Sequence, residues 1–110
     1  MKKKRFKSHF RFGKKILNNG HPTYIYAKVD NEYKFIGLTH APVTKGIKNI
    51  KLDKNPNPKD EKISYARNRV FKASDDKFGN KLSHWEFCDS DKDKIKKIVK
   101  YDENKTQKKK

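Results

Sequence analysis

Hydroxyl, imidazole and ammonium groups gather in one short stretch of the sequence, which runs from Thr39-His40 through Thr44 and Lys45 to Lys48. Metal-free RNA cleavage needs one group that deprotonates the ribose 2′-hydroxyl and another that protonates the leaving 5′-oxygen. It also needs cations beside the phosphate. We therefore expect Thr39, His40 and Lys45 to be catalytic and the loop after "IGLTH" to wrap a phosphate. Alternatively, Thr39 ends a strand, His40 lies on the surface and the lysines are solvated.

A second group alternates arginine with aromatic residues in the segment "YARNRVF". In a strand, Tyr65, Arg67, Arg69 and Phe71 would share one face. Aromatic rings stack on the bases of single-stranded RNA, and guanidinium groups bind phosphate, so this face is predicted to bind nucleic acid. In the alternative interpretation, Tyr65 and Phe71 lie in the core and both arginines extend past them to solvent.

The net charge indicates the kind of partner. The chain has 110 residues, with 30 Lys+Arg against 13 Asp+Glu and a formal charge of +17. Such a chain repels itself unless it lies against a polyanion, and its apolar runs are too short to span a membrane. RNA or DNA is therefore the expected partner, with no membrane contact. The basic residues expected to bind nucleic acid, besides the two arginines above, are Lys3, Lys4, Arg5, Arg11, Lys48 and Lys51.

The other residues of chemical interest are predicted to be structural. His21 in "NGHP" is interpreted as a turn residue and His84, beside Trp85, as a packed or surface histidine. Cys88 is the single cysteine, which excludes an internal disulfide, and no Cys/His spacing is typical of a zinc site. The carboxylates, including Asp60-Glu61 in a proline loop, do not converge from different elements, so neither a metal site nor a cofactor is predicted.

The elements that must position these residues follow from the pattern of apolar residues. Strands are predicted at 23–29 and 32–40, joined by a turn, with a bulge or a close backbone approach at Gly37. The further strands predicted are 47–52, 64–73 and 82–87, with a helix as the alternative for 64–73. A helix is predicted within 90–100, where Ser90 and Asp93 form a capping pattern and three apolar residues make one stripe.

Together these elements predict an α+β fold: a small, strongly bent antiparallel sheet or partly open barrel of about five strands with a C-terminal helix. Residues 1 to 20 carry eight basic residues and no acid. We therefore expect residues 1–19 to form a disordered basic arm, 20–101 a single folded domain and 102–110 a basic tail. The first residues lack the apolar segment of a signal peptide, which favours a cytoplasmic protein.

The order "HPTYIYAKV" and then "NEYKFIGLTHAPVTKG" resembles the opening strands of the MazF/PemK-like endoribonuclease toxins, in particular the ToxN/AbiQ-like branch. Leu38-Thr39 match the Leu-Thr of an "LTSPK"-like element, His40 stands where Ser is usual, and Pro42 and Lys45 follow with extra residues between. The resemblance covers roughly residues 22–45. It implies a curved sheet, sequence-selective RNA cleavage without metal, and neutralisation by an antitoxin. In this resemblance Thr39 would orient the phosphate or the 2′-hydroxyl, and Lys45 would supply positive charge.

Two hypotheses follow. The first is a metal-independent endoribonuclease of toxin type that cleaves RNA by 2′-hydroxyl attack, using Thr39, His40, Lys45 and one of Arg67 or Arg69. The second is a non-catalytic, basic nucleic-acid-binding protein of phage or plasmid origin, whose basic arms supply affinity. A protein-binding role against an acidic partner is a third and more distant alternative.

Overall fold

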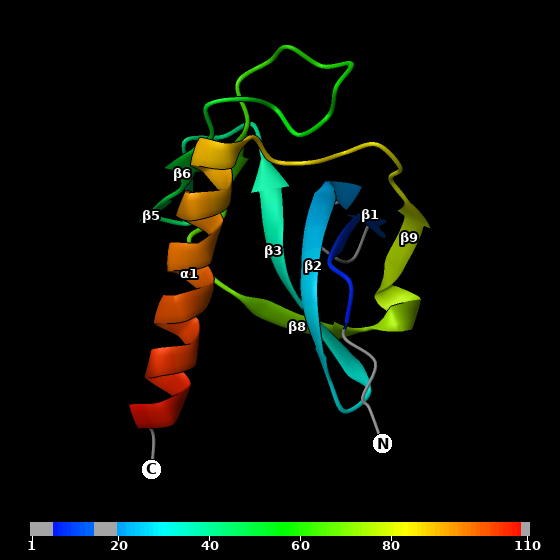
Figure 1. The fold of residues 1–110 in the computed structure, drawn as a ribbon, viewed down its shortest axis with the longest axis vertical. Coiled ribbons are helices and arrows are strands. Elements are labelled where there is room, and N and C mark those ends of the chain that lie inside the picture. The colour runs from blue at the N-terminus through cyan, green and yellow to red at the C-terminus, as the bar shows by residue number, and fades with distance from the viewer. Residues whose placement is uncertain (1–5, 15–19, 109–110) are drawn as a thin grey trace.

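The structure is a computed structural model that describes residues 6–14 and 20–108. In these residues a large antiparallel sheet, a small two-stranded sheet and a C-terminal α-helix form the fold (Figure 1), which confirms the predicted α+β class. The sheet has seven strands in the order β6-β7-β3-β2-β1-β9, with β8 also paired to β3, and β4 and β5 form a separate two-stranded sheet. The elements are β1 (His9–Gly13), β2 (Pro22–Val29), β3 (Glu32–Thr39), β4 (Val43–Thr44), β5 (Ile47–Lys48), β6 (Ile50–Lys51), β7 (Tyr65–Ala66), β8 (Phe71–Ser74), the 3-10 helix η2 (Asp75–Lys77), β9 (Phe78–Lys81) and α1 (Asp89–Lys108).

Strands β2 and β3 form the predicted hairpin. The turn is closed by Asp30, whose φ of 56° lies in the left-handed region that Asp tolerates better than most residues. Thr23 pairs with Gly37, and the register shifts between Ile25 and Ala27. The irregularity in this pair therefore lies in β2, and of the two alternatives predicted at Gly37 the bulge is absent from the pairing with β2.

Strand β3 has partners on both edges, because the predicted strand 64–73 lies along it in two pieces. Ala66 of β7 pairs with Leu38, and Phe71 of β8 pairs with Phe35. Between these pairs the segment 67–70 is longer than the part of β3 that it faces, so it leaves the ladder. This interruption sets the position of both arginines in the segment.

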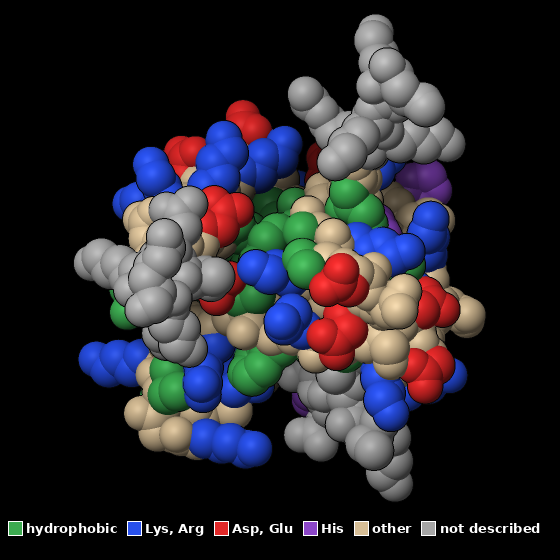
Figure 2. Space-filling model, turned by 90° about the horizontal axis from the view of Figure 1, so that it is seen from below, with side chains coloured by type: hydrophobic (Ala, Val, Ile, Leu, Met, Phe, Trp, Pro, Cys, Tyr) green, Lys and Arg blue, Asp and Glu red, His purple; other side chains and the backbone are tan. Residues whose placement is uncertain are grey.

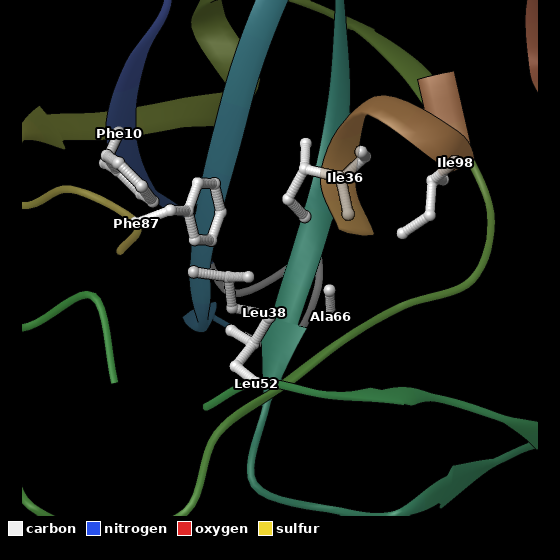
Figure 3. Packing of buried hydrophobic residues seen from close by; sticks show 8 residues of the cluster. Phe10, Ile36, Leu38, Leu52, Ala66, Phe87 and Ile98 are labelled. Atoms are coloured by element: carbon white, nitrogen blue, oxygen red, sulfur yellow. The ribbon is translucent and has the colours of Figure 1, made fainter. Parts of the chain in front are cut away.

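The two faces of the sheet carry separate cores, as expected when successive side chains of a strand point to opposite sides. One core contains Ile36 and Leu38 of β3 with Phe10, Phe87 and Ile98, and Figure 3 shows these side chains packed between the sheet and α1. The second core contains Ile25, Phe35, Ala73 and Phe78. The helix covers only the first face, where its predicted apolar stripe packs as expected.

Three sequence predictions about these elements are wrong. The basic arm was predicted to include residues 9–13, but β1 pairs with β2 and β9 because Phe10 is buried in the first core. Segment 82–87 is not a strand, since a turn at His84 has φ 68° and breaks the extended backbone. The helix continues through 102–108, which was predicted to be a mobile tail.

Candidate functional site

The start of β2 and the end of β3 lie at the same end of the hairpin, because the two strands are antiparallel. Extending their register beyond the pair Thr23–Gly37 places His21 opposite Thr39. A small pocket of about 40 Å³ forms at this end of the hairpin. Its polar lining includes His21, Thr39, His40, Asn55, Asp60 and Ser64, and Trp85 closes one side.

His40 is held by an acidic partner from a distant loop. Its Nε2 lies 3.6 Å from Oδ2 of Asp60, with the two side chains 52% and 28% exposed. The main cause that lowers the pKa of Asp60 is the hydrogen bond from the backbone amide of Lys62, and the charge of His40 contributes as well. Asp60 is therefore an ionised partner that can orient the imidazole.

The proline-containing loop between β6 and β7 is fixed in shape by its own side chains. Asn55 Oδ1 accepts from the amide of Asn57 at 2.9 Å, and Asp60 Oδ1 accepts from the amide of Lys62 at the same distance. Asn55 Nδ2 donates to the carbonyl of Lys62 at 3.1 Å, closing the loop. Such local bonds hold Asx turns in place of regular structure, so Asp60 faces His40 from a defined position.

Thr39 and His40 lie together at the pocket, whereas Lys45 does not line it. Thr39 Oγ1 accepts the amide of Ala41 at 3.1 Å, which leaves its hydroxyl proton available to another acceptor. Lys45 is an exposed residue in the turn between β4 and β5, with φ 49°. Asn49 stabilises this hairpin by donating to the hydroxyl of Thr44 at 2.8 Å. The stretch predicted to wrap a phosphate therefore folds as a small hairpin.

The two arginines of "YARNRVF" converge on one ring. The guanidinium carbons of Arg67 and Arg69 lie 5.1 and 5.7 Å from the centroid of Phe71. Burial and the neighbouring charge of Arg69 lower the pKa of Arg67. Neither arginine has an ion pair among the residues described in the structure. Two crowded cations without a carboxylate favour the binding of an anion such as phosphate.

The arginine pair and the histidine pocket border opposite faces of the sheet. The ring of Phe71 lies 5.9 Å from that of Phe35, which belongs to the second core. Trp85, which lines the pocket, packs against the first core. The single site predicted to contain His40 with Arg67 or Arg69 is thus divided between two faces.

The remaining predicted nucleic-acid-binding residues have different surroundings. Tyr65 pairs with Thr39 on one side and with Lys51 on the other, so these three lie in one row across the sheet. Lys48 is exposed on β5. Arg11 is engaged within the fold, because its guanidinium donates to Asp75 at 2.7 Å and its Nε donates to a carbonyl of β9. Lys3, Lys4 and Arg5 lie outside the described residues.

Sequence reasoning missed His21, Asp60 and Trp85 as members of this site. The hairpin register was a signal for His21, because a turn at residues 30–31 brings the residue before β2 opposite the end of β3. No comparable signal existed for Asp60 or Trp85, since both approach the pocket from irregular segments. Only the packing of the proline loop and of segment 82–87 brings them there.

Among the residues that the structure describes, no group of three or more His, Cys, Asp or Glu side chains is arranged to hold a metal ion. In the same part of the chain, no helix has both the length and the hydropathy needed to cross a bilayer. Comparison with family models, with curated proteins and with solved structures finds no match to this chain. The resemblance to the MazF/PemK-like toxins therefore rests on the sequence pattern of residues 22–45 alone.

Proposed function

We propose that the chain is a metal-independent endoribonuclease whose site is the pocket between His21 and His40. The observation that carries this proposal is the 3.6 Å contact between His40 and Asp60 in a pocket that His21 also lines. Two imidazoles beside one small pocket are suited to a reaction that needs a base and an acid near neutral pH. The high positive charge of the chain supports RNA as the substrate.

The reaction assigns one proton transfer to each histidine. His40, oriented by Asp60, accepts the proton of the ribose 2′-hydroxyl, and the 2′-oxygen forms a bond to phosphorus. The bond from phosphorus to the 5′-oxygen breaks, and protonated His21 gives its proton to that oxygen. The products are a 2′,3′-cyclic phosphate and a 5′-hydroxyl. The hydroxyl of Thr39 donates a hydrogen bond to a phosphoryl oxygen as negative charge develops there.

The test is incubation of purified, nucleic-acid-free protein with total cellular RNA in EDTA, followed by mapping of the new 5′ ends. Discrete cuts with 5′-hydroxyl ends are expected. They should fall by about 10²-fold or more in His40→Ala and in His21→Ala, which each remove one acid–base group. Cleavage that persists unchanged in both variants would refute the proposed site, and intact RNA in every reaction would refute the proposed activity.

A non-catalytic nucleic-acid-binding protein is the second candidate, and the arginine pair over Phe71 favours it. This arrangement offers phosphate donors and an aromatic surface and needs no catalytic group. RNA that is shifted on a gel but remains intact would support this role. Loss of that shift in Arg67→Ala but not in His40→Ala would place binding on the face of the second core.

We further propose that the protein acts in the cytoplasm, where its RNA is found, and that an antitoxin inhibits it. The second statement depends on the resemblance over residues 22–45, and both depend on the ribonuclease activity itself. Co-expression with the product of a neighbouring gene tests the second statement. Rescue of growth by that gene product, with no rescue needed for His40→Ala, is the expected result.

A further inference from the structure

A second and larger hollow lies beside the histidine pocket, between α1 and the strands β1 and β2. Figure 1 shows the segment that connects β9 to α1 crossing the sheet at one end, beyond β2 and β3. The groove has a volume of about 770 Å³, which is typical of ligand-binding clefts (about 300–1,000 Å³).

The floor and the wall of the groove differ in chemistry. Aromatic residues form much of the floor, among them Tyr24 and Trp85, which are only partly buried. The helix contributes Lys92, Lys96 and Lys100 as exposed residues at intervals of four. Such residues share one helix face and follow one another at about 6 Å along its axis. The wall is thus a line of ammonium groups parallel to an aromatic floor.

Two of the lysines that line the groove, Lys96 and Lys100, have no ion pair among the described residues. Lys7 lines the opposite side. The groove also contains the carboxylates of Glu86 and Glu103, so its charge is mixed with an excess of positive groups. Ammonium groups bind phosphate, and carboxylates accept hydrogen bonds from the amino groups of bases.

The groove and the histidine pocket are neighbours, because Trp85 lines both. We propose that single-stranded RNA lies in this groove, with its phosphates along Lys96 and Lys100 and a base against Trp85, and that it reaches the His21–His40 pocket past Trp85. The identity of the pocket as a cleavage site rests on the proposed function, whereas binding in the groove does not.

The surroundings favour RNA over a peptide. An extended peptide binds by adding to a free sheet edge, but β1 lies between β2 and β9, and β2 lies between β1 and β3. An acidic peptide helix would offer no partner to the carboxylates of Glu86 and Glu103. RNA has partners for the lysines, the aromatic rings and these two carboxylates alike.

Trp85 allows a direct test, because it is the only tryptophan of the chain. The probe is a short single-stranded RNA with 2′-O-methyl groups, which lacks the attacking hydroxyl and remains intact. Titration of the full chain should give a saturable change in Trp85 fluorescence. Lys96→Gln should weaken binding and lower the slope of log K against log salt by about 1. The matched control is Lys97→Gln on the same helix, an exposed lysine that does not line the groove.

Each of the other outcomes would contradict the proposal that RNA binds in the groove. An unchanged Trp85 signal would exclude contact with the base, and equal losses in the two lysine variants would indicate diffuse charge instead of a defined path. Binding of an acidic peptide that depends on Lys96, without binding of RNA, would assign the groove to a protein partner. Cleavage of unmodified RNA is measured separately: binding without cleavage refutes only the ribonuclease, and cleavage unaffected by Lys96→Gln refutes only the groove.

Discussion

His40 depends on a contact that forms only when the proline loop is folded. Asp60 reaches the imidazole at 3.6 Å, and the hydrogen bond from Lys62 fixes the carboxylate in the loop. In a proton-transfer reaction an ionised partner of this kind orients the base and stabilises the imidazolium that forms. In the proposed reaction Asp60 is therefore a positioning residue and not a group that touches the phosphate.

The corresponding variant is Asp60→Asn, which keeps an oxygen that can accept from Lys62 but removes the charge beside His40. We expect RNA cleavage to fall by about 10-fold or more, with the thermal melting point little changed. The matched control is Glu61→Gln, which changes the neighbouring acid of the same loop and should leave cleavage intact. A purely structural role for Asp60 would instead lower the melting point together with the cleavage rate.

Helix α1 and the proline loop are joined at the first turn of the helix. Asp91 is fully buried, and its carboxylate accepts from the amides of Asp53 and Lys54 at 2.7 and 3.0 Å. Lys94 lies 3.3 Å from the same carboxylate. The predicted capping pair of Ser90 and Asp93 is replaced by this arrangement, in which the helix begins at Asp89 and the Ser90 hydroxyl donates to Asp53 at 2.6 Å.

This junction predicts a large stability effect in Asp91→Ala. The substitution leaves two backbone amides without their acceptor and the Lys94 ammonium without a buried partner. We expect the free energy of unfolding to fall by about 2–4 kcal/mol. Urea denaturation measures the change, and Asp93→Ala on the exposed side of the same helix serves as the control. A loss no larger than that of the control would show that the junction contributes little.

The same junction predicts a dependence of stability on pH. The Ser90 hydroxyl and the Lys94 ammonium lower the pKa of Asp53 from its usual value of 3.8, with a smaller contribution from Lys51. Because the folded-state pKa is depressed, this contribution to stability is present above pH 3.8 and is lost as the pH falls through the lower folded value. The melting points of the wild type and of Asp53→Asn should therefore differ at neutral pH and converge in acid. A constant difference over the whole range would contradict this linkage.

For the whole molecule, the net charge of +17 is the dominant long-range feature. The described surface mixes both signs, and Figure 2 shows Lys and Arg side chains interspersed with acidic ones around a central hydrophobic area. Binding to RNA should consequently weaken steeply with salt, since each phosphate that a cation neutralises releases counterions.

The position of β1 limits how many N-terminal residues can be removed without disrupting the sheet. Removal of residues 1–15 would delete β1 and the buried Phe10, whereas removal of residues 1–5 leaves the sheet intact. We expect the shorter deletion, which includes Lys3, Lys4 and Arg5, to keep the melting point and lower the salt slope of RNA binding. Filter binding over a range of salt measures the slope. An unchanged slope would show that these residues do not contact the phosphates.

Residues close in sequence decided much of the fold. The alternating strands around the turn at Asp30 and the apolar stripe of α1 were predictable, because each follows from the period of its own residues. The division of segment 64–73 was not predictable, since it arises from pairing with β3. Strand β1 was missed because its residues were assigned to the basic arm from their positive charge. The burial of Phe10 depends instead on Phe87 and on the helix, which are distant in the sequence.

The sequence by itself determined the charge, the hairpin, the helix and the types of residue that could act on a phosphodiester. Only the tertiary structure decided which of them meet. The proline loop places Asp60 beside His40, and His21 and Trp85 line the same pocket. Lys45 lies in a separate turn. Arg67 and Arg69 lie over the ring of Phe71, which packs against the second core. The physical reason is that these contacts are made by segments without a regular period, whose positions are set by packing and hydrogen bonds between distant parts of the chain.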